Sequence, residues 1–139
     1  MKVLLVLALC IAAASAGVVD TTRCGGVGTF REMRIANCEG AICYMTPGTP
    51  YACEGDIIPS SAAAALRLKV SATYLGFPVS IIDTLLENSS VQPGVQYTVR
   101  FTITPNDILS GNTLPVRAEV SNDASTLVEI CVSVQVHIN

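Results

Sequence analysis

The sequence predicts an all-β sandwich, and three observations favour this fold class. Several runs alternate apolar and polar residues with a period of two, which is typical of strands with one buried and one exposed face. Turn-forming glycine, proline and asparagine residues separate these runs at short intervals. Five cysteines follow an apolar N-terminal leader, as in many disulfide-stabilised extracellular domains.

The first 16 residues have the features of a secretory signal peptide. Met1 and Lys2 form a short basic start, residues 3–13 are apolar, and Ala14-Ser15-Ala16 has the small residues that signal peptidase recognises. The apolar run is shorter than the roughly 20 residues that a membrane-spanning helix needs. We therefore expect cleavage after Ala16 and a mature region, residues 17–139, of the size of one domain.

The clearest strands are predicted over residues 66–74 and 95–103. In both runs every second residue is apolar, and the residues between them are polar or charged. Alternation over residues 116–120 and 128–138 predicts a C-terminal hairpin with its turn at Asn122-Asp123. In the last run the pattern points Glu129, Cys131 and His137 toward solvent.

Residues 60–65 are ambiguous, because Ser60-Ser61 followed by four alanines has the propensity to cap and begin a helix. The alternation that starts at Leu66 does not fit a period of 3.6 residues. We therefore predict a loop that leads into a strand.

The five cysteines after the leader allow fifteen arrangements of two disulfides and one free thiol, so spacing alone leaves the pairing open. Proximity favours Cys38 with Cys43. A bridge from Cys24 to Cys131 fits a sandwich best, because it joins the first strand to the last. Cys53 is then the odd thiol, either a redox or intermolecular site or, as we favour, a small buried apolar residue beside Tyr51.

Charge and composition argue against nucleic-acid binding and catalysis. Without Lys2 the chain has seven basic and 11 acidic residues, a net charge of −4, which gives no electrostatic footprint for nucleic acid. The one histidine, His137, lies on a predicted outward position, and the acids are too scattered for a calcium loop. We expect no enzymatic activity, no metal and no cofactor.

Several short motifs together resemble those of the ML (lipid-recognition) domain family, which includes the lysosomal Niemann-Pick type C sterol carrier and the house-dust-mite group 2 allergens. The resemblance covers the chain from about Val18 to Ile138. The motifs, in order, are Cys24, Cys38-Glu-Gly-Ala-Ile-Cys43, Pro47-Gly48-Thr49-Pro50-Tyr51, Tyr74-Leu75-Gly76-Phe77-Pro78-Val79, Pro93-Gly94-Val95-Gln96-Tyr97, Leu114-Pro115-Val116 and Glu129-Ile130-Cys131.

This resemblance implies an immunoglobulin-like sandwich of two antiparallel sheets with an apolar cavity between them, and the disulfides Cys24–Cys131 and Cys38–Cys43. The sequence departs from the family in two respects. No cysteine lies between Ile81 and Val91, in the loop expected after Val79, where the family has a third bridge. Val132 follows the last cysteine, where the family's sterol carriers often have tryptophan.

We therefore expect a secreted or lysosomal, monomeric protein that holds a sterol, fatty acid or similar lipid between its sheets, with transient contact to a membrane or receptor. The alternative is a secreted protein-recognition module, of an innate-immune or adhesion type, with a filled core. Asn88-Ser89-Ser90 is a glycosylation sequon at Asn88. The residues expected to contact lipid are Tyr51, Cys53, Tyr74, Phe77, Val79, Ile81, Tyr97, Val99, Phe101 and Ile103.

Overall fold

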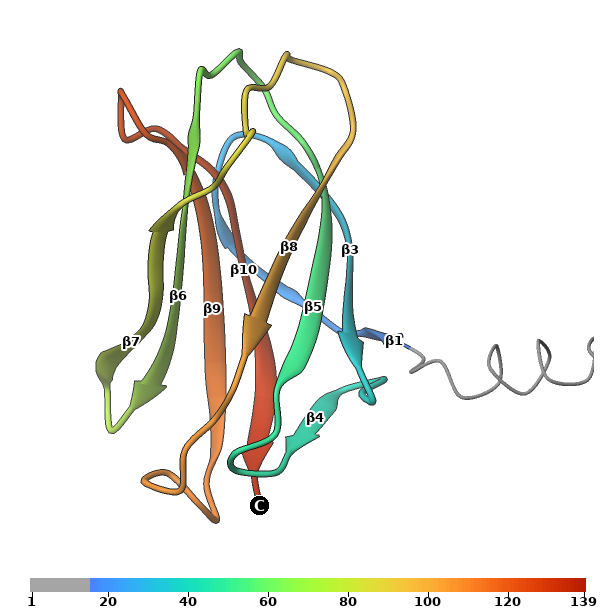
Figure 1. Ribbon diagram of the computed structural model, residues 1–139, viewed down its shortest axis with the longest axis vertical. Coiled ribbons are helices and arrows are strands. Elements are labelled where there is room, and N and C mark those ends of the chain that lie inside the picture. The colour runs from blue at the N-terminus through green and yellow to red at the C-terminus, as the bar shows by residue number, and fades with distance from the viewer. Residues whose placement is uncertain (1–15) are drawn as a thin grey trace, which may run out of the picture.

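The computed structural model describes residues 16–139, which form ten strands and no helix (Figure 1). The predicted signal peptide lies outside the described residues except for Ala16, which begins the first strand. The strands are β1 (Ala16–Val19), β2 (Thr22–Gly25), β3 (Thr29–Ala36), β4 (Ile42–Met45), β5 (Tyr51–Ile58), β6 (Leu66–Tyr74), β7 (Phe77–Leu85), β8 (Tyr97–Ile103), β9 (Thr113–Asn122) and β10 (Val128–Ile138).

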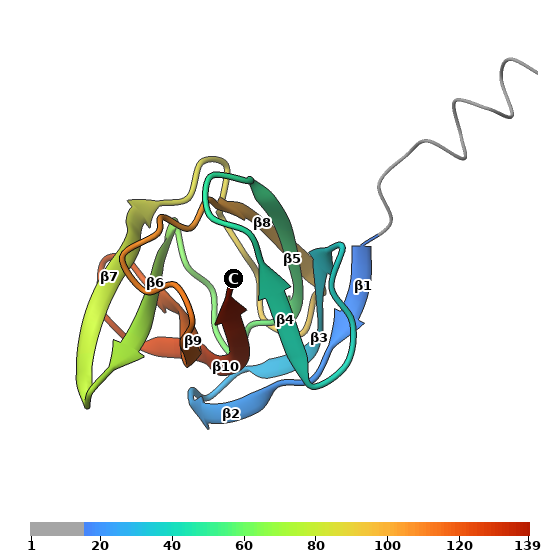
Figure 2. The same cartoon turned by 90° about the horizontal axis from the view of Figure 1, so that it is seen from below.

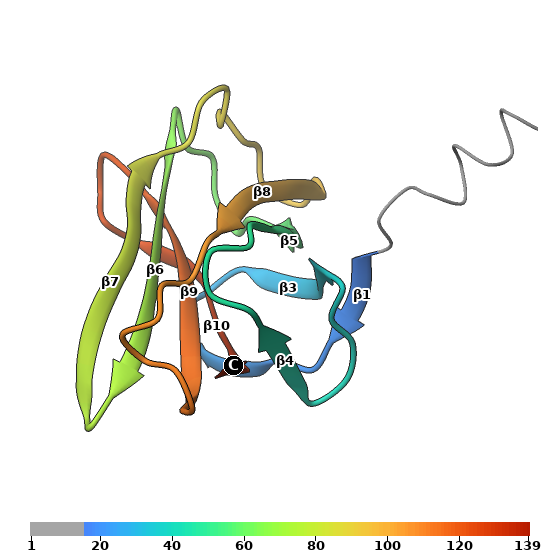
Figure 3. The same cartoon turned by 60° about the horizontal axis from the view of Figure 1, so that its bottom comes forward.

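The strands form two sheets that pack face to face, which confirms the predicted all-β sandwich (Figures 1 and 3). The smaller sheet has four strands in the order β1-β3-β5-β8, all antiparallel. The larger sheet has six strands, of which β10, β9, β6 and β7 pair antiparallel in that order. Two short strands share the other edge of β10: β2 pairs with it antiparallel, and β4 pairs with it in parallel.

Alternation located the clearest predicted strands well. The predicted strand over residues 66–74 is β6, and the run from residue 95 forms a strand from Tyr97 to Ile103. The C-terminal hairpin consists of β9 and β10, and its turn follows Asn122, whose Oδ1 accepts hydrogen bonds from the backbone N–H groups of Ala124 and Ser125. Residues 60–65 form no helix, as predicted.

The stretch after Val79, expected to be a loop, instead continues as strand β7. It pairs with β6 along its length and forms the edge of the larger sheet. A bulge interrupts the pairing, because Val70 is opposite Ile82 and Ser71 is opposite Ser80, which leaves Ile81 as the extra residue. The bulge breaks the simple alternation, so this strand was hard to recognise from the sequence.

Glu129 and Cys131 are buried, which corrects the prediction that they face solvent. The carboxylate of Glu129 accepts hydrogen bonds from the Ser60 backbone N–H (2.8 Å) and from the hydroxyls of Ser60 (3.0 Å) and Ser61 (2.8 Å). Gly28 lies against this carboxylate and against the Glu129 carbonyl, where a side chain would not fit. Glu129 therefore fastens two loops to the start of β10.

Both predicted disulfides are present. Cys24 in β2 is bonded to Cys131 in the neighbouring strand β10, so this bridge lies within the larger sheet. Cys38, which follows β3 of the smaller sheet, is bonded to Cys43 in β4 of the larger sheet. The second bridge, rather than the first, therefore connects the two layers.

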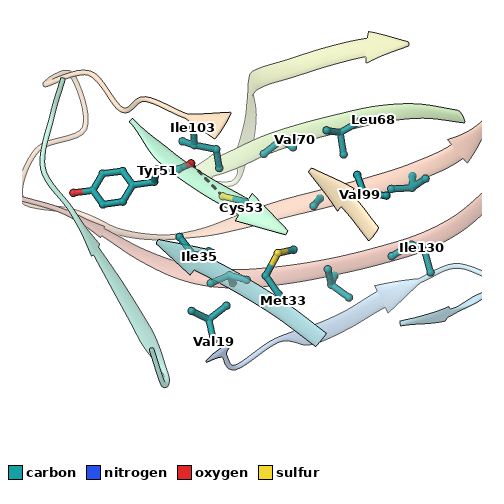
Figure 4. Close-up of a cluster of buried hydrophobic side chains, with 14 of the residues drawn as sticks. Val19, Met33, Ile35, Tyr51, Cys53, Leu68, Val70, Val99, Ile103 and Ile130 are labelled. Atoms are coloured by element: carbon teal, nitrogen blue, oxygen red, sulfur yellow. Dashed lines mark hydrogen bonds between the residues drawn. The ribbon is translucent and has the colours of Figure 1, made fainter. Parts of the chain in front are cut away.

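Side chains from both sheets fill most of the interior (Figure 4). Leu68, Val70 and Ile130 come from the larger sheet, and Met33 and Ile35 come from the smaller one. Between residues 16 and 139 there is no helix long and apolar enough to cross a membrane.

Candidate functional site

An open cleft separates the two sheets at one end of the sandwich, the lower end in Figure 1. Seen from that end, β6 and β7 lie on one side of the opening and β5 and β8 on the other (Figure 2). The cleft has a volume of about 510 Å³, which is within the range of roughly 300–1,000 Å³ typical of small-molecule sites. It is larger than four other hollows among the described residues, whose volumes are about 20, 320, 310 and 300 Å³.

The wall of this cleft is apolar, and its polar groups lie near solvent. Most lining residues are aliphatic side chains from β6, β7, β9, β10 and the loop between β8 and β9. The lining residues are Met45, Ala72, Tyr74, Val79, Ser80, Ile81, Ile103, Thr104, Pro105, Asn106, Ile108, Leu109, Leu114, Val116, Val136 and Ile138.

A small void continues the hollow into the core. Its volume is about 20 Å³, enough for about one water molecule. Met45, Ile103, Val116 and Val136 line both the void and the cleft and so form the partition between them. The hollow that the resemblance implied between the sheets is therefore confined to one end, and the rest of the interior is solid.

Four of the residues expected to contact lipid line the cleft: Tyr74 at the end of β6, Val79 and Ile81 in β7, and Ile103 at the end of β8. Val79 and Ile81 are 43% and 41% exposed, although they are aliphatic. An apolar ligand in the cleft would cover the exposed parts of these two side chains, which lie on the edge strand β7.

The other six expected contacts lie elsewhere. Phe77 is 73% exposed beside the β6–β7 turn. Tyr51 is buried, and its hydroxyl accepts a hydrogen bond from the Thr46 backbone N–H. Phe101 and Cys53 line the small void. The remaining two, Tyr97 and Val99, border a shallow groove beside the loop of residues 86–91, at the opposite end of the sandwich.

Phe77 was expected from the family resemblance, and alternation placed the other five on the inward face without showing how far along each strand the hollow extends. Cys53, Val99 and Phe101 lie deeper than the cleft, which begins where β8 ends; Tyr51 is paired with Ile103 at that end, but its hydroxyl is bonded to the Thr46 N–H. Position along the strand, and not only the face of the sheet, therefore decides which residues can contact a ligand.

The prediction missed the loop between β8 and β9, which supplies Pro105, Ile108 and Leu109 to the cleft. Its sequence carried a signal, because Ile108-Leu109 places two large aliphatic residues between turn-forming residues at Pro105 and Gly111. Ile108 is 79% exposed, whereas its neighbour Leu109 packs against the hydrophobic core.

Cys53 is a buried free thiol, as the preferred sequence interpretation held. Its Sγ lies 3.5 Å from the carbonyl oxygen of Tyr51 (Figure 4). Burial raises the pKa of the Cys53 thiol to about 12, so the nucleophilic thiolate is scarce at neutral pH. This environment suits a packing residue and not a nucleophile.

The outer face of the smaller sheet carries a cluster of charges that crosses three strands. The Arg34 guanidinium donates to the carboxylates of Glu32 (2.8 Å), Asp56 (2.7 and 3.0 Å) and Glu54 (3.4 Å). Arg100 in β8 also donates to Glu54. The hydrogen bond from Arg34 holds the pKa of Asp56 below its ordinary value of 3.8, against an opposing effect of burial.

No arrangement typical of a metal or catalytic site appears among residues 16–139. No group of three or more metal-ligating side chains is found in that range. His137 is half-buried, with Nδ1 2.8 Å from the Thr113 hydroxyl and its ring centroid 5.5 Å from that of Tyr44. His137 lies on the outward face of β10, as alternation predicted.

The sequon lies on the surface. Asn88 is exposed, in the left-handed backbone region with φ of 50°, in the loop that follows β7. The Ser89 hydroxyl donates to the carbonyl of Leu86 and accepts from the Leu66 N–H, which fixes this loop against β6.

Comparison with known proteins identifies the architecture. No protein-family model and no curated protein sequence matches the chain. A Niemann-Pick type C2 protein from the Japanese carpenter ant is similar in structure, with a TM-score of 0.72 and 17% identity over 86% of this chain and 99% of that one. Chicken MD-1, solved in complex with lipid IVa, has a TM-score of 0.56 and 12% identity over 88% and 96%.

The chain has the ML-domain fold. The C-terminal domain of wzt is also similar, with a TM-score of 0.60 and 14% identity over 86% of this chain and 77% of that domain. At these identities the likeness establishes only the ML-domain fold, so the ligand has to be inferred from the cleft of this chain.

Proposed function

We propose that this protein is a secreted carrier that holds a lipid, such as a sterol or a fatty acyl compound, in the cleft at the open end of the sandwich. The observation that carries the proposal is the apolar cleft of about 510 Å³ between the sheets. Two proteins of the same fold support it, a Niemann-Pick type C2 protein and an MD-1 solved with lipid IVa.

The cleft is large enough to give useful affinity through the hydrophobic effect. Each buried methylene contributes about 0.8 kcal/mol, so an acyl chain of about 16 carbons gives on the order of 10 kcal/mol before the costs of ordering are subtracted. The ligand would also cover the exposed parts of Val79 and Ile81.

Transfer of the ligand would occur at the mouth of the cleft. Ile108 lines the cleft, and Leu75 and Phe77 lie at the adjoining β6–β7 turn; their exposed fractions are 79%, 79% and 73%. Three exposed large apolar side chains at one end are consistent with the transient membrane or receptor contact that we propose.

Secretion is part of the proposal and rests on the predicted signal peptide and on the two disulfides, which persist in oxidising compartments. The exposed Asn88 would then be available for N-glycosylation. A shift in mass on treatment with a peptide N-glycosidase, absent in Asn88→Gln, would test this part.

A pair of tryptophan substitutions on β7 tests the function. Val79→Trp would fill the cleft from a half-exposed position, whereas Leu85→Trp, at a similarly exposed position on the same strand, lies outside the cleft. Organic extracts of the purified protein are examined by mass spectrometry, and displacement of a fluorescent lipid is measured for each variant.

We expect bound lipid in the wild type and in L85W, and at least tenfold weaker binding in V79W with an unchanged unfolding midpoint. A wild-type protein that neither co-purifies with lipid nor binds the probe would overturn the proposal. Val99, by contrast, is a poor position for such a test, because it lies outside the cleft.

A further inference from the structure

The cleft offers no charge to a ligand, and this indicates which lipids it accepts. Resting on the proposed function, we infer that the cleft takes an uncharged amphiphile, such as a fatty or sterol alcohol or an ester, in preference to the corresponding carboxylate anion. The inference concerns the headgroup and depends on three features of the mouth.

The first feature is the lack of cations in the cleft. None of its lining residues is a lysine, arginine or histidine. Four of the seven basic residues between residues 16 and 139 are instead in ion pairs with carboxylates elsewhere: Arg34, Arg67, Arg100 and Arg117. An anionic headgroup that entered the cleft would lose hydration without gaining a salt bridge.

The second feature is a set of neutral hydrogen-bonding groups on the cleft wall. Tyr74 and Thr104 each present a hydroxyl, and neither hydroxyl is hydrogen-bonded to another group of residues 16–139. The Oδ1 atom of Asn106 accepts from the Ile108 N–H, which leaves its NH₂ group available. Hydroxyls and amides satisfy a hydroxyl or ester headgroup without the desolvation that a carboxylate requires.

The third feature is the sign of the nearest charge in the loop. Asp107 lies between the lining residues Asn106 and Ile108 and is exposed. It is the one charged residue in the β8–β9 loop, residues 104–112. Its charge opposes an anionic headgroup at the mouth, although screening by water makes this effect smaller than the lost hydration.

The size of the cleft favours a ligand with one extended chain or one compact ring system. The cleft volume of about 510 Å³ lies within the range of roughly 300–1,000 Å³ typical of sites for single small molecules. A hexadecyl chain is therefore a suitable probe.

The test compares three probes that share this chain: hexadecan-1-ol, methyl hexadecanoate and hexadecanoate. Each competes with an uncharged fluorescent probe, N-phenyl-1-naphthylamine, at neutral pH and below its aggregation concentration. We expect the alcohol and the ester to displace the probe at concentrations at least tenfold lower than the acid.

A matched pair of arginine substitutions on β7 tests the cause. Val79→Arg introduces a cation at the cleft, whereas Leu85→Arg introduces one at a similarly exposed position of the same strand outside it. The ratio of alcohol to acid affinity should fall about tenfold in V79R and stay unchanged in L85R, with unfolding midpoints reported for both.

The outcomes separate the two proposals. If the wild type binds hexadecanoate as tightly as hexadecan-1-ol, or if V79R leaves the ratio unchanged, the inference about the headgroup is wrong and the carrier function stands. If no probe binds, the carrier function fails and the inference fails with it.

Discussion

Single buried polar side chains have two different roles in this protein. Glu129 is 1% exposed, and its carboxylate organises the loop at Ser60-Ser61 through accepted hydrogen bonds, whereas Cys53 is equally buried and packs as an apolar residue. The sequence predicted the packing role of Cys53 but not the role of Glu129, because the alternating pattern gives the face of a strand and not the partners of a side chain.

Removing the Glu129 carboxylate should destabilise the protein. Glu129→Ala leaves the Ser60 N–H and the hydroxyls of Ser60 and Ser61 without their acceptor; because these groups are only part-buried, water replaces some of the lost bonds and each loss costs about 1 kcal/mol. We expect a loss of about 3 kcal/mol in the free energy of unfolding, measured by urea denaturation. Ser61→Ala, which removes one donor, should cost about 1 kcal/mol. An E129A variant as stable as the wild type would contradict this assignment.

Cys53 should be chemically inert in the folded state. With a pKa raised to about 12 and 1% exposure, its thiol provides little thiolate and little access. We expect no reaction with an aromatic disulfide reagent over an hour at neutral pH and one equivalent of reaction in denaturant without reductant. Rapid labelling of the native protein would instead favour the redox interpretation.

At the scale of the element, strand edges and strand ends determine the site. β7 is an edge strand whose bulge at Ile81 breaks the pairing with β6, and the loop after β8 closes the other side of the cleft. The sequence predicted the fully paired strand β6 to its exact residues, because both faces of its pattern are regular. It did not predict β7, where the bulge at Ile81 leaves the pattern irregular.

The charge cluster across β3, β5 and β8 should make stability depend on acid pH. Because the pKa of Asp56 is lowered in the folded state, its contribution is present above its ordinary pKa of 3.8 and is lost as pH falls through the folded-state value. The difference in unfolding free energy between wild type and Asp56→Asn should therefore be largest at neutral pH and shrink below about pH 4.

The matched control for this experiment is Asp20→Asn, because Asp20 is exposed and has no ion pair with residues 16–139. Its difference from wild type should stay near zero at each pH. If the difference in unfolding free energy between wild type and D56N is constant between pH 3 and pH 7, the ion pair between Arg34 and Asp56 does not contribute to the pH dependence of folding.

At the scale of the whole molecule, the long disulfide should dominate global stability. Cys24 and Cys131 are 107 residues apart, and the chain-entropy model assigns about 5 kcal/mol to a loop of this length and about 2 kcal/mol to the short loop between Cys38 and Cys43. The double variant C24A/C131A should therefore lose more unfolding free energy in urea than C38A/C43A. The reverse order would mean that the link between the layers matters more than the length of the loop.

The whole fold was more predictable than the site within it. Alternation and turn residues fix the faces of the strands, and these suffice for a two-layer sandwich, including the inward positions Cys53, Ala72 and Ala118. The extent of the hollow depends on how far the two layers diverge along their length, which no local pattern records. Tyr74 and Ile103 lie at strand ends beside the cleft, whereas Tyr97 and Val99 lie away from it on an equally regular strand.

Both sulfur bridges lie toward the β1, β2 and β4 side of the sandwich, and neither involves β7 or β8, whose margins flank the mouth. The disulfides therefore hold the strands together on one side of the sandwich, and the β7 and β8 side carries none. Separation of the sheets on that side would disturb packing and hydrogen bonds but would break no covalent bond, so the cleft could widen for ligands of different width while both disulfides stay intact.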